Sequence, residues 1–129
     1  MIKTDPIIAV KDVVHSSQWY QQLLECTSIH GGDEFDVLVD GGGQVVLCLH
    51  KWQEHEHPTM SDPSASPGNG LILYFRTSSM EQVRANLESM GGQVEDEVSV
   101  NPNSHHREFT LRDPDGYYLI ISEYHDYGI

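Results

Sequence analysis

Histidine offers the most versatile chemistry in this sequence, and five of its eight histidines fall into two groups. The groups are His50, His55 and His57 around Trp52, and the adjacent pair His105 and His106. Imidazole binds transition metals and transfers protons near neutral pH, so convergence of these rings would create a metal or acid–base site. Because His55 and His57 lack the spacing of helical ligands, we predict solvent-exposed loop histidines. Whether the two groups converge on a metal stays open at this point.

A second set of residues places aromatic rings and a cation on predicted strands. Strand alternation puts Tyr74 and Arg76 on one face of a strand, and Tyr118 and Ser122 on one face of another. Stacking surface, hydroxyl groups and one fixed cation are typical of a small-molecule pocket. Trp52 could cover the mouth of such a pocket or anchor the chain at a sheet edge. We predict that all five residues bind a ligand; the alternative is that the tyrosines fill the core or an interface.

Nucleophilic chemistry has little support in the sequence. Cys48 lies among apolar residues of a predicted strand, which predicts a buried and inert thiol, although His50 would share its face. Cys26 is the only other cysteine, and so small a set favours reduced thiols over a disulfide. The sequence contains no nucleophile motif and no phosphate-binding loop.

Charge and composition exclude several classes of partner. The 129 residues carry a formal charge of −13, from 7 basic and 20 acidic residues. This charge repels nucleic acid and anionic membranes, and it either keeps the protein in solution or attracts a cationic ligand. The longest apolar runs are far shorter than the ~20 residues of a membrane helix, and the first residues do not resemble a signal peptide. We expect a cytoplasmic protein that binds neither nucleic acid nor membrane.

The first half of the chain predicts a strand, a helix and a hairpin. The apolar run 6–10 predicts a strand, and the spacing of the apolar residues after it predicts a helix that Ser16 or Ser17 caps. The segments 35–39 and 45–49 flank the turn Asp40-Gly41-Gly42-Gly43, which is typical of a hairpin.

The second half repeats this order after a connector rich in proline, glycine and serine. We predict a strand at 71–75, then a helix with Ser78 and Glu81 in a capping box and a stop at Gly91. The predicted strands that follow are 93–100, 107–112 and 117–124, the last after the turn Asp113-Pro114-Asp115-Gly116.

The repeat predicts the fold class. We expect one α+β domain made of two βαβββ modules, which form a curved mixed sheet with the helices on its outer face. Module one is residues 1–52, the connector is 53–70 and module two is 71–129. A sheet curved in this way encloses a cleft.

Four segments of the sequence resemble a known superfamily. They are Asp5 to Asp12, Ser16 to Leu24, Arg107 to Phe109, and Asp113 to Glu123. Together they resemble the vicinal oxygen chelate superfamily, which includes glyoxalase I, bleomycin-resistance proteins, fosfomycin-resistance enzymes and extradiol dioxygenases. The resemblance covers nearly the whole chain and implies the duplicated fold described above. It also implies a homodimer.

The resemblance implies where a metal would bind in catalytic members. The matching positions in this sequence are Asp5, Leu47, Gly70 and Ile120. Only the carboxylate of Asp5 can be a metal ligand, and one ligand does not make a site. We therefore predict no metal and no cofactor, and the metal-free, bleomycin-binding branch becomes the closer model.

Three hypotheses for the function follow. The first is a metal-free small-molecule binding protein that resembles bleomycin-resistance proteins and holds a ligand, for which a cationic molecule is one candidate, in the concave cleft. The alternative is a metal-dependent lyase, isomerase or dioxygenase that uses Asp5 together with histidines. The third is an interaction module whose groove holds a peptide or another subunit. The sequence leaves open whether the protein is an enzyme and which ligand it takes.

Overall fold

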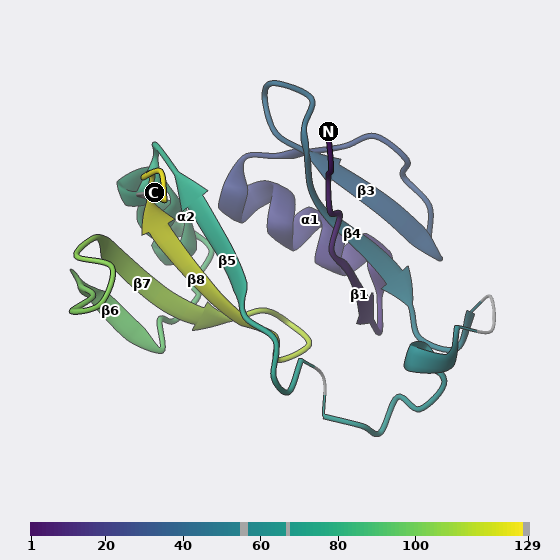
Figure 1. The fold of residues 1–129 in the computed structure, drawn as a ribbon. Coiled ribbons are helices and arrows are strands. Elements are labelled where there is room, and N and C mark those ends of the chain that lie inside the picture. Colours follow the sequence, from purple (N-terminus) through teal and green to yellow (C-terminus); the bar gives the residue numbers. More distant parts are fainter. Residues whose placement is uncertain (55–56, 67, 128–129) are drawn as a thin grey trace. The chain divides into compact units, whose positions relative to one another are not determined.

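The structure of the protein is a computed structural model that describes residues 1–54, 57–66 and 68–127. The chain divides into two compact units, Met1–Pro67 and Gly68–Ile129. In the described part of each unit there are one α-helix and one four-stranded sheet (Figure 1). Within the described ranges, no helix has the length and apolar character needed to cross a bilayer.

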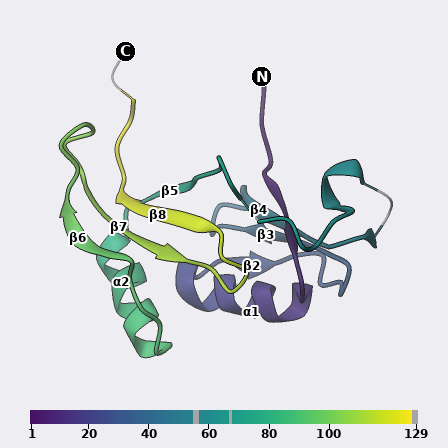
Figure 2. The same ribbon diagram turned by 90° about the horizontal axis from the view of Figure 1, so that it is seen from below.

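The first unit contains the first βαβββ module. Its elements are β1 (Ile7–Val10), α1 (Val13–Leu24), β2 (Thr27–Ser28), β3 (Phe35–Val39) and β4 (Val45–Lys51), followed by the short 3-10 helix η2 (Pro58–Met60). The strand order is β1-β4-β3-β2, with β1 parallel to β4 and the other pairs antiparallel. Figure 2 shows α1 along one face of this sheet. In each unit, the sheet face opposite the helix is called the open face below.

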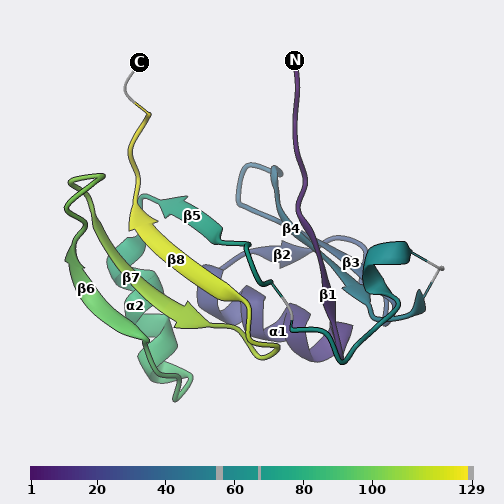
Figure 3. The ribbon, with the colours of Figure 1, turned by 60° about the horizontal axis from the view of Figure 1, so that its bottom comes forward.

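The second unit has the same topology. Its elements are β5 (Leu73–Thr77), α2 (Met80–Ser89), β6 (Asp96–Val100), β7 (Arg107–Arg112) and β8 (Tyr118–Glu123). The strand order is β5-β8-β7-β6, with β5 parallel to β8. Figure 3 shows α2 behind β7 and β8. The prediction of two βαβββ modules in the α+β class is thus confirmed.

Strand alternation explains which residues form the two cores. In the first unit, Leu47 and Leu49 of β4 are completely buried and lie on the same face as Val10 of β1, beneath α1. In the second unit, Leu119 and Ile121 of β8 take the corresponding place beneath α2. The intervening residues of these strands point to the open face, although several of them, among them Cys48, His50 and Ser122, are buried there.

The helix caps differ from the prediction. Asp12 caps α1, because its extended backbone lets the carboxylate accept a hydrogen bond from the backbone N–H of His15 at 3.0 Å. Ser16 and Ser17 lie inside the helix and are buried, so they do not cap it. In α2 the cap is Ser79, which makes no side-chain hydrogen bond to the helix, so the predicted capping box is wrong.

Some element boundaries also differ from the prediction. A turn in which the backbone N–H of Leu71 donates to the carbonyl of Gly68 delays β5 until Leu73. The short strand β2 was not predicted, because two residues carry no detectable alternation. The predicted bounds of β7 and the left-handed Gly91 after α2 are confirmed.

A buried carboxylate joins α1 to the sheet and to the loop before β3. Asp36 is 1% exposed, and both of its oxygens accept hydrogen bonds from the hydroxyl of Ser28, at 2.7 and 2.8 Å. The backbone N–H groups of Gly31 and Val37 donate to it as well, each at 2.8 Å. Burial acts to raise the pKa of Asp36, but hydrogen bonds from Ser17 of α1 and from these groups outweigh it and hold the pKa below its usual value.

We predict that Asp36→Asn lowers the free energy of unfolding by about 2–4 kcal/mol, because an amide cannot accept all of these bonds. The contribution of Asp36 is fully present above the carboxyl's unfolded pKa of about 3.9 and is lost as the pH falls through the lower folded pKa. Denaturant unfolding between acidic and neutral pH measures both effects. Asp33→Asn, at an exposed position in the same loop, is the control and should change stability by less than about 0.5 kcal/mol.

Candidate functional site

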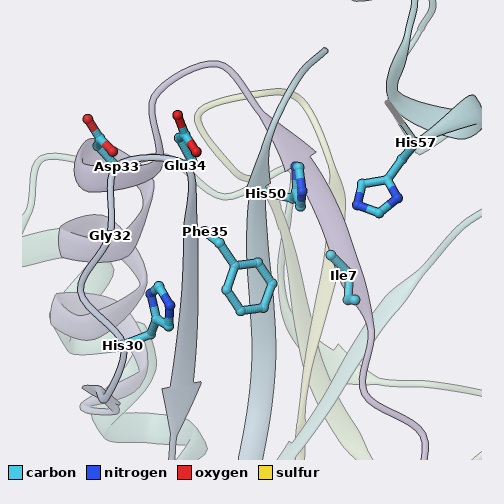
Figure 4. Close-up of a pocket in the computed structure, with 8 residues that line it drawn as sticks. All are labelled: Ile7, His30, Gly32, Asp33, Glu34, Phe35, His50 and His57. Carbon is cyan, nitrogen blue, oxygen red and sulfur yellow. The ribbon is translucent and has the colours of Figure 1, made fainter. Parts of the chain in front are cut away.

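The open face of the first sheet carries a pocket with a volume of about 480 Å³ (Figure 4). The residues that line it are Ile7, His30, Gly32, Asp33, Glu34, Phe35, His50 and His57. All of them belong to the first unit and come from β1, β3, β4, the loop before β3 and the segment before η2. We call it the first-unit pocket.

Four aromatic rings form a row in the first-unit pocket (Figure 4). The ring of His30 meets that of Phe35 edge to face, with 5.3 Å between centroids. Phe35 meets His50 at 6.0 Å, and His50 meets His57 at 4.8 Å, again with steeply inclined planes. Beside the row lies Ile7, which is 50% exposed. The pocket therefore combines polar imidazoles with accessible apolar surface.

His50 is the most buried imidazole of the row. It is 4% exposed, and its Nδ1 lies 2.8 Å from the carbonyl oxygen of Lys51. A carbonyl oxygen only accepts, so Nδ1 carries a proton and donates it. His50 belongs to β4, where it shares the face of Cys48 as predicted, but it is buried, so the prediction of solvent exposure is wrong for this histidine. His57 is exposed, whereas His55 lies outside the described residues.

The loop before β3 places His30 and Phe35 side by side. The Asp36 carboxylate holds the backbone of this loop at Gly31, and Gly32 follows directly. A Cβ added at Gly32 would lie 2.7 Å from the carbonyl oxygen of Phe35 and 3.1 Å from the His30 ring. Only glycine fits this close approach without displacing the pocket wall.

The predicted ligand residues Tyr74 and Arg76 lie together on the open face of the second sheet. Tyr74 lines a pocket of about 390 Å³ with Ser104, His106, His125, Asp126 and Tyr127, which we call the second-unit pocket. Arg76 lies next to Tyr74 on β5, and its guanidinium carbon is 4.6 Å from the centre of the Tyr127 ring. The structure thus groups these two predicted residues with His106, a member of the second histidine group, and with His125 and Tyr127, which were not predicted.

The other predicted ligand residues do not line the second-unit pocket. Tyr118 lies beneath the guanidinium of Arg112, whose central carbon is 4.9 Å from the centre of the Tyr118 ring. Ser122 pairs with Arg76 in the sheet register but is completely buried, and its hydroxyl donates to the carbonyl of Glu123. Trp52 belongs to the first unit, where it follows β4.

The two histidines of the second group have different surroundings. His105 is exposed and has a left-handed backbone, with φ of 65°. His106 is half-buried and stacks on His125 with ring centroids 4.0 Å apart and planes inclined by 6°. Its Nδ1 lies 3.4 Å from a carboxylate oxygen of Glu123.

Three of the four residues at the metal positions that the resemblance implies cannot be metal ligands. Leu47 is completely buried on the face that α1 covers, whereas Cys48 and His50 of β4 lie on the face of Ile7. Gly70 has no side chain, and Ile120 is apolar. Within residues 1–54, 57–66 and 68–127, no three histidine, cysteine, aspartate or glutamate side chains gather closely enough to hold a metal.

The thiols of the first unit are poor nucleophiles. Cys26 and Cys48 are both free and buried. Burial raises the pKa of Cys26 to about 11, and burial together with the negative charges of Asp5 and Asp36 raises the pKa of Cys48. Because the thiolate is the reactive form, both groups stay protonated and inert near neutral pH.

The family is established by comparison with known proteins. Residues 4–121 match the model of the Glyoxalase/Bleomycin resistance protein/Dioxygenase superfamily. The protein therefore belongs to this superfamily, as its sequence motifs indicated. No curated protein sequence matches the chain significantly.

Solved structures share the fold at low sequence identity. A bleomycin resistance determinant encoded on the transposon Tn5 has a TM-score of 0.71 and 16% identity, over 98% of this chain and 100% of that one. Lactoylglutathione lyase from Agrobacterium tumefaciens has a TM-score of 0.71 and 16% identity, over 95% and 92%. A virulence protein from Salmonella typhimurium has a TM-score of 0.72 and 22% identity, over 97% and 98%. These similarities establish the fold.

We predict that Gly32→Ala displaces His30 and Phe35 and lowers the free energy of unfolding by about 1–3 kcal/mol, because the added methyl group meets a backbone oxygen. Gly41→Ala is the matched control, since a Cβ there has no neighbour within 4 Å among the described residues. It should change stability by no more than about 1 kcal/mol, in the stabilising direction. NMR shifts of the His30 ring and denaturant unfolding measure both variants. Equal stability and unchanged His30 shifts in Gly32→Ala would contradict this account of the loop.

Proposed function

We propose that the protein binds a small organic molecule, without a metal ion, in the first-unit pocket. The observation that carries this proposal is the row of four rings beside the half-exposed Ile7. Apolar and aromatic surface supplies affinity, and a few polar groups fix the orientation of a ligand. The imidazoles of His30, His50 and His57 provide those polar groups.

Membership of the superfamily is consistent with this proposal, because proteins of the superfamily bind small molecules. The ligand residues predicted from the sequence extend the proposal beyond the first-unit pocket. Tyr74, Arg76, Tyr118 and Ser122 occupy β5 and β8 of the second unit, and Trp52 follows β4. We propose that they contribute to ligand binding as well, each within its own unit, with the completely buried Ser122 acting only through the strand that carries its neighbours.

Ligand titration of matched histidine variants tests the proposal. Bleomycin and a panel of aromatic and cationic compounds are titrated while the NMR signals of the histidine rings are followed. A bound ligand should shift His30, His50 and His57 saturably, and His57→Ala should weaken binding about fivefold through loss of one ring contact. His15→Ala, at an exposed position in α1, should bind as the original protein does. Flat titrations across the panel would argue against the proposal.

The alternative is a metal-dependent lyase, isomerase or dioxygenase. The adjacent rings of His50 and His57 favour it, since two imidazoles are a common part of metal sites. Asp5 would have to join them as a further ligand. Elemental analysis of protein purified without a histidine tag decides between the two functions: stoichiometric Zn, Ni, Mn or Fe supports the enzyme, and its absence supports metal-free binding.

We also propose that the protein is a cytoplasmic homodimer. The family resemblance motivates the dimer, and the two free cysteines fit a reducing compartment. Size-exclusion chromatography with light scattering should give twice the 14.5 kDa chain mass. A mass equal to that of a single chain across the micromolar range would contradict the dimer.

A further inference from the structure

The segment 124–127, which follows β8, packs onto the open face of the second sheet. Figure 3 shows this part of the chain leaving β8, and its residues form several contacts with β5. The hydroxyl of Tyr74 lies 2.9 Å from Nε2 of His125. Arg76 donates a hydrogen bond from Nη1 to the backbone oxygen of His125. The segment thus meets β5 at the two residues predicted to bind a ligand.

The ring of His125 is surrounded as a bound ligand would be. His106 stacks on its face at 4.0 Å, and Tyr127 meets its edge at 5.5 Å with planes inclined by 81°. Tyr74 meets it edge to face at 6.2 Å and also supplies the hydrogen bond. The His125 ring therefore has a stacking partner and a hydrogen bond, and its backbone carbonyl accepts a hydrogen bond from a cation. These contacts together are those that a small heteroaromatic group with a carbonyl needs.

Residues outside the segment hold this arrangement in place. Glu123 accepts hydrogen bonds from the backbone N–H and from Nε of Arg107, at 2.9 and 3.2 Å, and its carboxylate also lies against His106. Arg107 is fixed in turn by Glu81 of α2 at 3.0 Å. The stacking surface of His106 is therefore positioned by β7, β8 and α2 rather than by His125 alone.

The second-unit pocket leaves room beside His125. Its volume of about 390 Å³ is bounded by Ser104, Asp126 and Tyr127 in addition to the rings already described. This is within the range of small-molecule sites, about 300–1,000 Å³. A compound can therefore approach Tyr74 and His106 from this side and replace the His125 ring.

We infer that Tyr74, Arg76 and His106 form a second binding site, and that the protein's own His125 fills it. The contacts that His125 makes define the chemistry of the ligand that this site accepts. The site takes a small nitrogen heteroaromatic compound that carries a carbonyl or carboxylate group, because the ring meets Tyr74 and His106 while the oxygen accepts from Arg76. The ligand competes with segment 124–127, whose occupancy lowers the apparent affinity in proportion to the fraction of filled sites.

A rescue experiment with the full chain tests this inference. His125→Ala removes the ring from the site but keeps the backbone carbonyl near Arg76. N-acetylhistidine methylamide, which reproduces the ring and the carbonyl, is titrated while the NMR signal of the His106 ring is followed. We expect saturable binding with a dissociation constant on the order of 1 mM, at least about tenfold tighter than in the original protein. Tyr74→Phe in the His125→Ala background should weaken binding about threefold to tenfold through loss of the ring hydrogen bond.

Matched controls separate this site from other causes. N-acetylalanine methylamide has the same backbone without the ring and should not shift the His106 signal. His15→Ala removes an exposed histidine elsewhere and should behave as the original protein does. Equal affinity of the original protein and His125→Ala, or the absence of saturable binding to a folded His125→Ala, would overturn the inference. His125→Asn, which keeps a polar side chain, replaces His125→Ala if the latter does not fold.

Discussion

The buried Asp36 carboxylate is the interaction on which the geometry of the first unit depends. It lies between the sheet and α1 and accepts hydrogen bonds from Ser28, Gly31 and Val37. A buried charge is tolerated only when its oxygens are satisfied, so the loop from Gly31 to Asp36 is held in one path. That path carries His30 and Phe35 to the open face. The aromatic row is therefore a consequence of a hydrogen-bond network on the other side of the same strand.

The two units share the same topology, but the open faces of their sheets differ in the surface that a ligand can reach. In the first unit, half-exposed Ile7 and the row of rings leave apolar surface accessible to a ligand. In the second unit, segment 124–127 covers the corresponding face and engages both Tyr74 and Arg76. Duplication of a module conserves the sheet and the helix behind it, whereas the segments that cross the open face are free to differ.

The order of strands and helices could be predicted from the sequence, because apolar periodicity and glycine turns act over a few residues. The run Val45 to Leu49 and the stop at Gly91 are examples of such local signals. The first-unit pocket could not be predicted in the same way. Ile7, His30 and His50 are far apart in the sequence and meet only through the parallel β1–β4 pairing and the loop that Asp36 holds. For His125, the closely spaced Tyr124 and Tyr127 were the available signal, but their packing on Arg76 depends on tertiary structure.

Among the described residues, each pocket is lined by one unit alone, residues 7–57 for the first pocket and 74–127 for the second. A substitution in the lining of one pocket therefore leaves the lining residues of the other pocket unchanged. If both pockets bind ligands as proposed, selection can retune the affinity of one half while the second keeps its original preference. A duplicated chain of this kind is well suited to acquiring new ligands stepwise, without passing through an intermediate that binds nothing.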